Sequence, residues 1–307
     1  MKKIIYALGF FDGVHLGHKA LLDTCVKLAE EENAIPGVLT FAGSPQSLMK
    51  EDAGLLTTLE ERQMLFSQMG MEEILILPFD EKLKKMPWQV FYCLLKEQHS
   101  AVGFVCGEDF RFGAGGAGTA ALLQDICQKE GLSCRVVEKV KVGEDTVSSR
   151  LIRRLLEDGQ LEKANALLGH PYLLSGKVVS GKQIGRTIGV PTANLSYNKE
   201  RICLPYGVYA CRVKLEGKYY GAVTNIGHRP TVEGEGITIE PWILDFAGDL
   251  YGSHLTLELL SFLRPEQKFQ NLEMLRAQIG EDAIHTREIF EKPGADPKKT
   301  EEKLRKS

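Results

Sequence analysis

The chain has 307 residues, of which 43% are hydrophobic, so it is long enough for two domains with cores of their own. Its net charge of −3 disfavours a polyanion-binding surface, and we expect neither nucleic acid nor membrane as a partner. Seven cysteines without a C-x-x-C pair argue against a zinc site or a disulfide framework, and no apolar run approaches the roughly 20 residues of a membrane span, so we expect a cytoplasmic protein.

The first half of the chain alternates strand-like with helix-like segments. Thr58 and Glu61 have the spacing of a capping box at one helix start, and Gly70 follows the end of that helix. We expect strands at 3–9, 35–41, 72–79, 101–107 and 134–142, and helices at 18–32, 58–70, 87–98 and 119–131. Uninterrupted apolar strands that alternate with helices predict an α/β domain whose parallel sheet is covered on both faces.

The pattern of apolar residues changes after residue 171. Before it, 150–159 and 161–169 predict a pair of helices. After it, short alternating runs between glycines and prolines predict a small all-β antiparallel barrel, closed by a last helix at 271–290. We therefore expect an α/β domain at 1–157, a helical connector at 158–171, a barrel domain with its C-terminal helix at 172–290, and a charged mobile tail at 291–307.

The stretch GFFDGVHLGH, from Gly9 to His18, joins the first strand to the first helix. Its glycines let the backbone approach a ligand, and the helix start directs free N–H groups and its positive dipole end toward an anion. His15 and His18 can both donate hydrogen bonds to phosphoryl oxygens that gain charge during displacement. The pattern favours nucleotidyl transfer, in which a phosphate attacks the α-phosphorus of ATP and pyrophosphate leaves. The alternative is a glycine-rich turn with two surface histidines.

A second stretch, GKVVSGKQIGRTIGVPTANL (176–195), combines glycines with cations. Gly181 and Gly185 allow close backbone approach, while Lys182 and Arg186 supply charge for phosphates. No Walker A pattern, G-x-x-x-x-G-K-[ST], occurs in the chain. The alternative is an ordinary hairpin loop.

Oxygen donors follow directly after this loop. The hydroxyl of Thr192 and the amide oxygen of Asn194 are hard ligands of the kind that Mg²⁺ or Mn²⁺ takes. Pro191 stiffens the approach to them. We therefore expect a site for a metal and for phosphates in the barrel domain.

FDGVHLGH resembles the signature of the nucleotidyltransferase superfamily, whose H-x-G-H motif binds ATP, and more narrowly that of the bacterial bifunctional riboflavin kinase/FMN adenylyltransferase (FAD synthetase) family. The resemblance implies a Rossmann-like domain in which Gly9 opens the nucleotide site. GEDFRFG resembles the segment that lines the nucleotide and flavin site, which implies Asp109 there. VSSRLIRRLLEDG resembles the family's S-S-T-x-I-R helix start, which implies Ser149 and Arg153 on ATP phosphates.

The second half is similar to riboflavin kinases. The glycine-rich array ending in P-T-A-N implies the phosphate and metal roles given above. In IEPWILDFAGDLYG, the glutamate before the L-D-F run is the family's base for the ribityl hydroxyl and matches Glu240; the alternative is an exposed carboxylate on a strand. The position two residues later, often histidine in the family, is Trp242 here. FLRPEQKF implies a nucleotide or flavin contact for Arg264.

The chain departs from the family pattern at three places in its first half. Gly43 and Ser44 replace a proline and a histidine, the segment 114–118 lacks basic residues, and Arg150 replaces a threonine. These changes remove possible phosphate donors from the nucleotidyltransferase half.

The resemblance, over residues 4–290, implies an enzyme that phosphorylates riboflavin to FMN in its barrel and adenylylates FMN to FAD in its α/β domain. It implies ATP, riboflavin, FMN, FAD, ADP and pyrophosphate as substrates and products, with Mg²⁺ or Mn²⁺ as the metal. A kinase with an impaired adenylyltransferase half, a non-catalytic flavin-binding regulator, and a nucleotidyltransferase for another acceptor are the alternatives.

Overall fold

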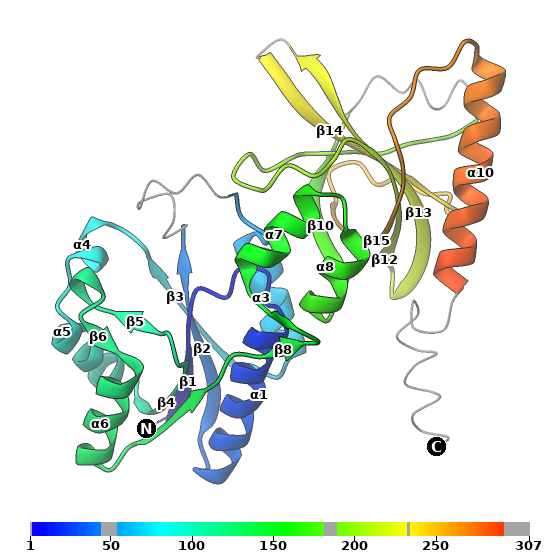
Figure 1. Ribbon diagram of the computed structural model, residues 1–307. Helices are drawn as coiled ribbons and strands as arrows, with labels where there is room; N and C mark the ends of the chain where they lie inside the picture. Colours follow the sequence, from blue (N-terminus) through cyan, green and yellow to red (C-terminus); the bar gives the residue numbers. More distant parts are fainter. Residues whose placement is uncertain (1, 44–53, 181–188, 232–233, 292–307) are drawn as a thin grey trace, which may run out of the picture. The chain divides into compact units, whose positions relative to one another are not determined.

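The computed structural model describes residues 2–43, 54–180, 189–231 and 234–291. The chain divides into two compact units, Met1–Leu151 and Ile152–Ser307 (Figure 1). The first unit contains an open sheet and the second a closed barrel. Among the described residues, no helix is long and apolar enough to cross a bilayer.

The first unit is built around five strands in the order β3-β2-β1-β4-β7. Every neighbouring pair in this sheet is parallel. The strands are β1 (Ile4–Leu8), β2 (Ile35–Ala42), β3 (Glu73–Pro78), β4 (Ala101–Gly107) and β7 (Ser133–Val137). The five apolar segments therefore form the parallel sheet that their sequence predicts.

Helices cover both faces of this sheet (Figure 1). They are α1 (Leu16–Glu31), α3 (Leu59–Gln68), the single turn α4 (Glu81–Lys84), α5 (Trp88–Cys93) with its π-helical continuation η1 (Leu94–Gln98), and α6 (Ala120–Glu130). Successive strand residues serve opposite faces. Cys25 of α1 donates to the carbonyl of Ile5 (3.2 Å) on one face, and Phe91 of α5 and Leu123 of α6 share a core with Tyr6 on the other.

The predicted capping box is present at the start of α3. Thr58 Oγ1 accepts a hydrogen bond from the backbone N–H of Glu61 (3.2 Å), and Glu61 Oε2 accepts one from the N–H of Thr58 (2.9 Å). The two bonds satisfy two of the free donors at the helix end. They fix the point at which the chain enters α3.

Two short hairpins were not expected from the sequence. The predicted strand 134–142 stops at Val137, and the chain then forms β8 (Lys141–Val142) and β9 (Asp145–Thr146) around Gly143, which has φ 61°. The second hairpin pairs β5 (Arg111–Phe112) with β6 (Gly118–Thr119) across the 3₁₀ turn η2 (Ala114–Gly116). Pairs of two residues leave almost no periodic signal in a sequence.

The second unit is a closed barrel of six strands in the order β10-β11-β14-β13-β12-β15. Every recorded pairing in it is antiparallel, as predicted. The strands are β10 (Tyr172–Val179), β11 (Asn194–Leu195), β12 (Gly207–Leu215), β13 (Lys218–Thr231), β14 (Gly234–Ile243) and β15 (His254–Pro265). Closure of the barrel leaves no open sheet edge.

Two helices precede the barrel strands in the sequence and one follows them. α7 (Ser149–Glu157) and α8 (Leu161–Leu168) are the predicted pair, and Gly169 ends α8 in the left-handed conformation (φ 78°). The predicted last helix, α10 (Leu272–Glu291), packs on β12, β13 and β15. Its Ala283 joins the buried side chains of Val208, Val223 and Leu244.

Candidate active sites

The loop after β1 has an unusual backbone. Phe11 (φ 59°), Gly13 (φ 82°) and Val14 (φ 41°) all have positive φ, and two of them carry side chains that rarely adopt it. Such conformations persist only where surrounding contacts hold them. The loop is therefore built for a specific shape.

Asp12 supplies these contacts. Its buried carboxylate accepts hydrogen bonds from the backbone N–H groups of Leu56 (3.0 Å) and Thr57 (3.0 Å). Gly13 N–H donates to Thr57 Oγ1 (2.9 Å), and Ser149 Oγ donates to the carbonyl of Asp12 (2.9 Å). Charge-assisted bonds to backbone donors are strong. Asp12 therefore anchors the loop and is not directed at a substrate.

The two histidines form a stacked pair at the start of α1. His15 is the N-cap residue, and its Nδ1 accepts a hydrogen bond from the backbone N–H of His18 (3.3 Å). The ring centroids are 3.6 Å apart with 12° between the planes. Because Nδ1 of His15 accepts, the proton of its neutral ring is on Nε2.

The surroundings of Gly17 explain why the third position of the H-x-G-H motif is a glycine. A Cβ at this position would lie 3.1 Å from Cε1 and 3.2 Å from Nδ1 of His15, tighter than an ordinary contact. The absence of a side chain lets the His15 ring lie against the helix start.

His18 is held as a neutral imidazole. Burial lowers its pKa well below 6.5, and the neighbouring His15 and Arg62 lower it further. Its Nδ1 is buried and has no hydrogen-bond partner among the described residues. The His18 ring is thus an uncharged hydrogen-bonding group before a ligand arrives.

A cavity of about 420 Å³ collects most of the residues predicted for this site. Its lining includes Gly9, His15, His18, Asp109 and Ser149. Lys139, which the sequence did not single out, also lines it and forms an ion pair with Asp109 (3.2 Å). The cavity lies where the carboxyl ends of β1 and β4 meet the start of α1, the usual position of ligands in α/β sheets.

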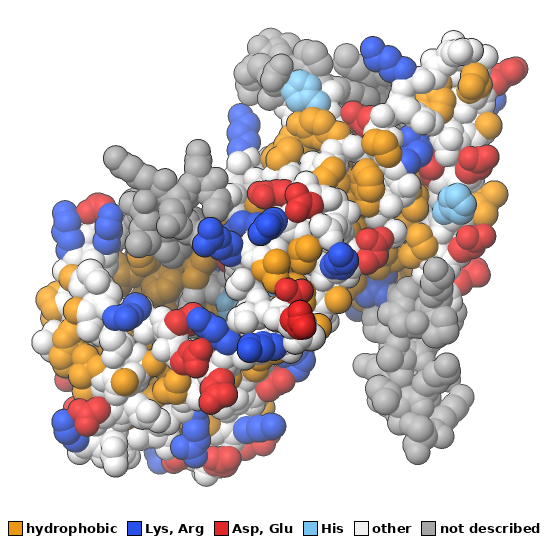
Figure 2. Space-filling model, in the orientation of Figure 1, with side chains coloured by type: hydrophobic (Ala, Val, Ile, Leu, Met, Phe, Trp, Pro, Cys, Tyr) orange, Lys and Arg blue, Asp and Glu red, His pale blue; other side chains and the backbone are white. Residues whose placement is uncertain are grey.

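Arg153 is not among the residues that line this cavity. It lies one turn after Ser149 in α7 and is buried, with 7% of its surface exposed. Arg150 and Arg154 are exposed on the same helix, where Figure 2 shows basic side chains. Arg153 therefore does not belong to the solvated face of α7.

In the second unit, strand register surrounds Glu240 with amide side chains. On β13, Asn225 is its direct cross-strand partner. On the other side, Leu195 pairs with Ile239, and Ala193 N–H donates to the carbonyl of Pro241 (2.9 Å). Continuing this register places Asn194 opposite Glu240. Directly opposed residues share a face and have Cβ atoms about 5 Å apart.

A cavity of about 590 Å³ opens over this face. It brings together three residues that the sequence predicted, Thr192, Glu240 and Arg264. Val190, Val208, Val223, Trp242, Leu275 and Ile279 give it an apolar wall, and Asn225, Glu266, Gln267, Lys268 and Asp282 add polar groups. An apolar pocket with a few convergent polar groups suits a small organic ligand.

Arg264 is fixed in this cavity by a bidentate ion pair. Its Nε donates to Asp282 Oδ1 (3.0 Å) and its Nη2 to Asp282 Oδ2 (2.8 Å). Asp282 is on α10 and is nearly fully buried. Asn225 Nδ2 donates to Glu266 Oε1 (3.3 Å). Asn225, Glu266 and Asp282 were not predicted from the sequence, although Glu266 lies inside the FLRPEQKF segment.

A smaller cavity of about 310 Å³ lies against residues 191–193. Thr192 lines both cavities. The smaller one is also lined by Pro191, Ala193, Pro241, Phe246 and Tyr251. A residue that lines two cavities suits a site where a group passes from a ligand in one cavity to a ligand in the other.

The donor set beside Glu240 fits a hard metal ion. Thr192 and Asn194, two residues apart and half-buried, offer oxygen atoms. Among the described residues there is no cluster of three or more His, Cys, Asp or Glu that could hold a metal. Few protein ligands, completed by phosphates and water, are typical of Mg²⁺. Gly181, Lys182, Gly185 and Arg186 lie outside the described residues.

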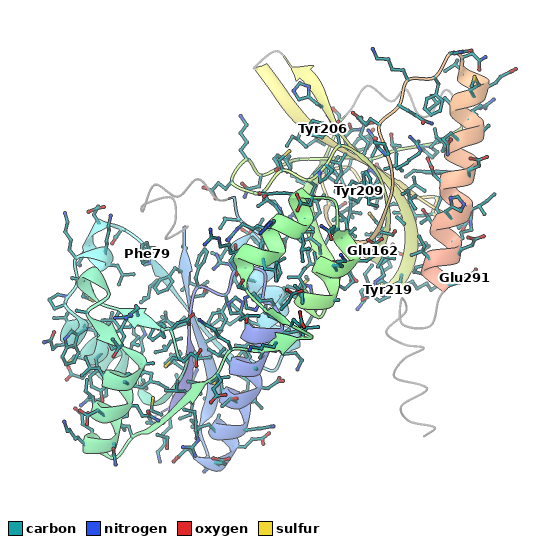
Figure 3. The ribbon with its side chains drawn as sticks, in the orientation of Figure 1. Phe79, Glu162, Tyr206, Tyr209, Tyr219 and Glu291 are labelled. Atoms are coloured by element: carbon teal, nitrogen blue, oxygen red, sulfur yellow. The ribbon has the colours of Figure 1, made fainter. Side chains whose placement is uncertain are left out.

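Two tyrosines of the barrel make structural contacts. Tyr209 is buried and donates to the carbonyl of Pro205 (2.6 Å), and the ring of Tyr219 lies under the guanidinium of Arg212 (4.9 Å). Figure 3 labels both, together with Tyr206. None of the three lines the 590 Å³ cavity.

Comparisons with known proteins divide the chain in the same way. The FAD synthetase family model matches residues 1–151, and the riboflavin kinase family model matches residues 168–290. The bifunctional riboflavin kinase/FMN adenylyltransferase of Bacillus subtilis (strain 168) is 37% identical over 291 residues, which are 91% of this chain and 90% of the relative. Its counterpart in Escherichia coli (strain K12) is 38% identical over 290 residues, 93% and 92% of the two chains.

A solved structure from Streptococcus pneumoniae, described as a macrolide-efflux protein, is 30% identical with a TM-score of 0.82. It covers 93% of this chain and 94% of its own. The efflux description belongs to that protein, and what the two share is the architecture of nearly their whole length.

Proposed function

Because the chain belongs to the family of bifunctional riboflavin kinase/FMN adenylyltransferases, we propose that each of its two units carries one of the two activities. The barrel transfers the γ-phosphoryl group of ATP to riboflavin, giving FMN and ADP. The α/β unit transfers the adenylyl group of ATP to FMN, giving FAD and pyrophosphate. The match of one family model to each half supports this division.

The observation that carries the kinase assignment is the position of Thr192 between two cavities, with Glu240 in the larger one. Riboflavin occupies the 590 Å³ cavity, and the phosphates of ATP reach Thr192 from the 310 Å³ cavity. Glu240 accepts the proton of the ribityl 5′-hydroxyl as that oxygen attacks the γ-phosphorus. Strand register places Asn194 and Asn225 on either side of this carboxylate.

Thr192 and Asn194 would hold Mg²⁺ or Mn²⁺ in the kinase site. The ion would neutralise charge on the phosphate oxygens of ATP. Gly181, Lys182, Gly185 and Arg186, which precede these ligands in the chain, are proposed to contact the same phosphates. Arg264, held rigid by Asp282, is proposed to contact the flavin.

Adenylyl transfer needs position and charge stabilisation rather than a covalent nucleophile. His15, the N-cap residue of α1 with its ring stacked on His18, is proposed to bind phosphate oxygens in the 420 Å³ cavity. His18, Ser149 and the free N–H groups of α1 complete the anion site, and Gly9 allows close approach. Asp109 lines the same cavity on the nucleotide and flavin side.

Several finer assignments stay predictions. Arg153 as a further phosphate ligand is supported by its place one turn after Ser149 in α7. The domain boundaries at residues 157, 171 and 290, the cytoplasmic location, and the lack of nucleic-acid and membrane partners also stay predictions.

The substitution Glu240→Gln tests the kinase assignment. It keeps the size of the side chain but removes the proton acceptor, so kcat for FMN formation should fall about a hundredfold or more. FMN adenylylation by the same variant should be unchanged. Both rates are measured by incubating the protein with ATP, Mg²⁺ and either riboflavin or FMN and separating the flavins by chromatography. Loss of both activities in a folded variant would contradict the division of labour.

A further inference from the structure

Trp242 shares one face of β14 with Glu240. Residues two apart in a strand point to the same side and are separated by about 6.7 Å. Both side chains line the 590 Å³ cavity. The indole is therefore one step along the strand from the carboxylate that meets the substrate hydroxyl.

The barrel core holds the indole on one side. Trp242 is the cross-strand partner of Val223 and packs against the cluster formed by Val208, Val223, Leu244 and Ala283. Leu275 and Ile279 of α10 continue the apolar wall of the cavity. An aromatic plane fixed in this way can receive a flat ring with little loss of side-chain freedom.

The part of the cavity on β13 and β14 has a polar end and an apolar end. On β13 and β14, the polar cross-strand pair of Asn225 and Glu240 lies two residues along from the apolar pair of Val223 and Trp242, and all four residues line the cavity. Riboflavin has the same division, a flat tricyclic ring joined to a five-carbon polyol chain. A hydroxyl at the end of that chain can reach Glu240 while the ring lies over the next residue of the same strand face.

Phe269 is the other aromatic residue of this lining, and it is already engaged. Its ring lies against the guanidinium of Arg264, with 5.7 Å between the ring centroid and Cζ. Of the two aromatic residues in the lining, Trp242 is the one that shares the strand face of Glu240.

Resting on the riboflavin kinase activity proposed above, we propose that the isoalloxazine ring stacks on the indole of Trp242. Trp242 then determines the affinity for flavin and takes no part in phosphoryl transfer. Its place two residues after Glu240 sets the distance between the stacked ring and the reacting hydroxyl.

Kinetics of Trp242 variants in the full chain test this role. Trp242→Leu keeps an apolar side chain but removes the ring, and KM for riboflavin should rise about tenfold to a hundredfold. Trp242→Phe keeps a smaller ring and should raise it only about threefold. In both variants, kcat at saturating riboflavin and KM for ATP should stay within about twofold of the parent. Trp88→Phe, a change at the other tryptophan of the chain, should leave all three constants unchanged.

A spectroscopic readout separates stacking from a merely structural effect. Riboflavin bound to the parent chain should show a red-shifted visible band, which weakens in Trp242→Phe and is absent in Trp242→Leu. An unchanged KM for riboflavin in Trp242→Leu, or a fall in kcat with KM unchanged, would overturn the inference. If Trp242→Leu does not fold, as judged by its unfolding transition, the same criteria apply to Trp242→Phe. Failure of the parent chain to make FMN would overturn the proposed function instead.

Discussion

The two sites of this chain are built by different means. The site of the α/β unit depends on a loop with three positive-φ residues, which Asp12 fastens to the backbone of Leu56 and Thr57. The barrel site depends on strand register, which places Glu240 opposite Asn225 and next to residues 192–194. Substitution of a residue that holds the loop, such as Asp12, can therefore disrupt the first site from a distance. The barrel site should be sensitive mainly to substitution of the side chains that line it.

The largest effect is expected from removing both histidines of the loop. In a His15→Ala/His18→Ala variant, adenylylation of FMN should fall about a thousandfold, because two side chains that bind the phosphate oxygens are lost. FMN formation should remain, since the barrel site has its own residues. Assays with FMN and with riboflavin as separate substrates measure the two rates. Normal FAD formation by this variant would remove the basis of the loop assignment.

A smaller effect is expected at the glycine of the same motif. In Gly17→Ala, the new Cβ would lie 3.1 Å from Cε1 of His15 and shift that ring, so adenylylation should fall about tenfold. The gain in helix propensity and the weakening of the His15 cap oppose each other, so the free energy of unfolding should change by no more than about 1 kcal/mol.

Gly280→Ala in α10 is the matched control for this substitution. A Cβ at that position meets no atom within 4 Å, so both activities should be unchanged. Equal activity of the Gly17→Ala and parent chains would show that the His15 ring position is not critical.

The smallest effect concerns the buried, neutral His18. Since its folded pKa is lowered from 6.5, the unfolded state takes up the proton first as the pH falls. The free energy of unfolding of the first unit should therefore decrease below about pH 6.5, by at most about 1.4 kcal/mol per pH unit. Above that pH the contribution is constant.

The pH dependence can be followed through Trp88 alone. In a Trp242→Phe background, Trp88 is the remaining tryptophan and reports unfolding of the first unit. Denaturant titrations at pH 7 and pH 5.5 should differ less when His18 is replaced by Asn. An equal pH dependence with and without His18 would show that its burial does not affect stability.

The features that were predicted correctly from the sequence arise from local patterns of residues. The alternation of strands and helices, the turn that bears His15 and His18, and the Thr192 segment are all short-range features, and the structure contains each of them. The predicted members Thr192, Glu240 and Arg264 share a cavity, as do Gly9 and His15.

The remaining features depend on contacts between distant parts of the chain. Asp12 reaches a backbone 44 residues later, and the partner of Arg264 is Asp282 on a separate helix. Asn225 meets Glu240 only through the register of β13 and β14. Such pairs have no spacing rule in the sequence, because tertiary packing and strand pairing determine them.

Mixing two inactivated chains tests the central claim most directly. Glu240→Gln and His15→Ala/His18→Ala proteins are each incubated with riboflavin, ATP and Mg²⁺, alone and together, and FAD is measured. The account predicts almost no FAD from either variant alone and restored FAD from the mixture, because FMN made by one chain is adenylylated by the other. A mixture of folded variants that makes no FAD would contradict the existence of two separate sites.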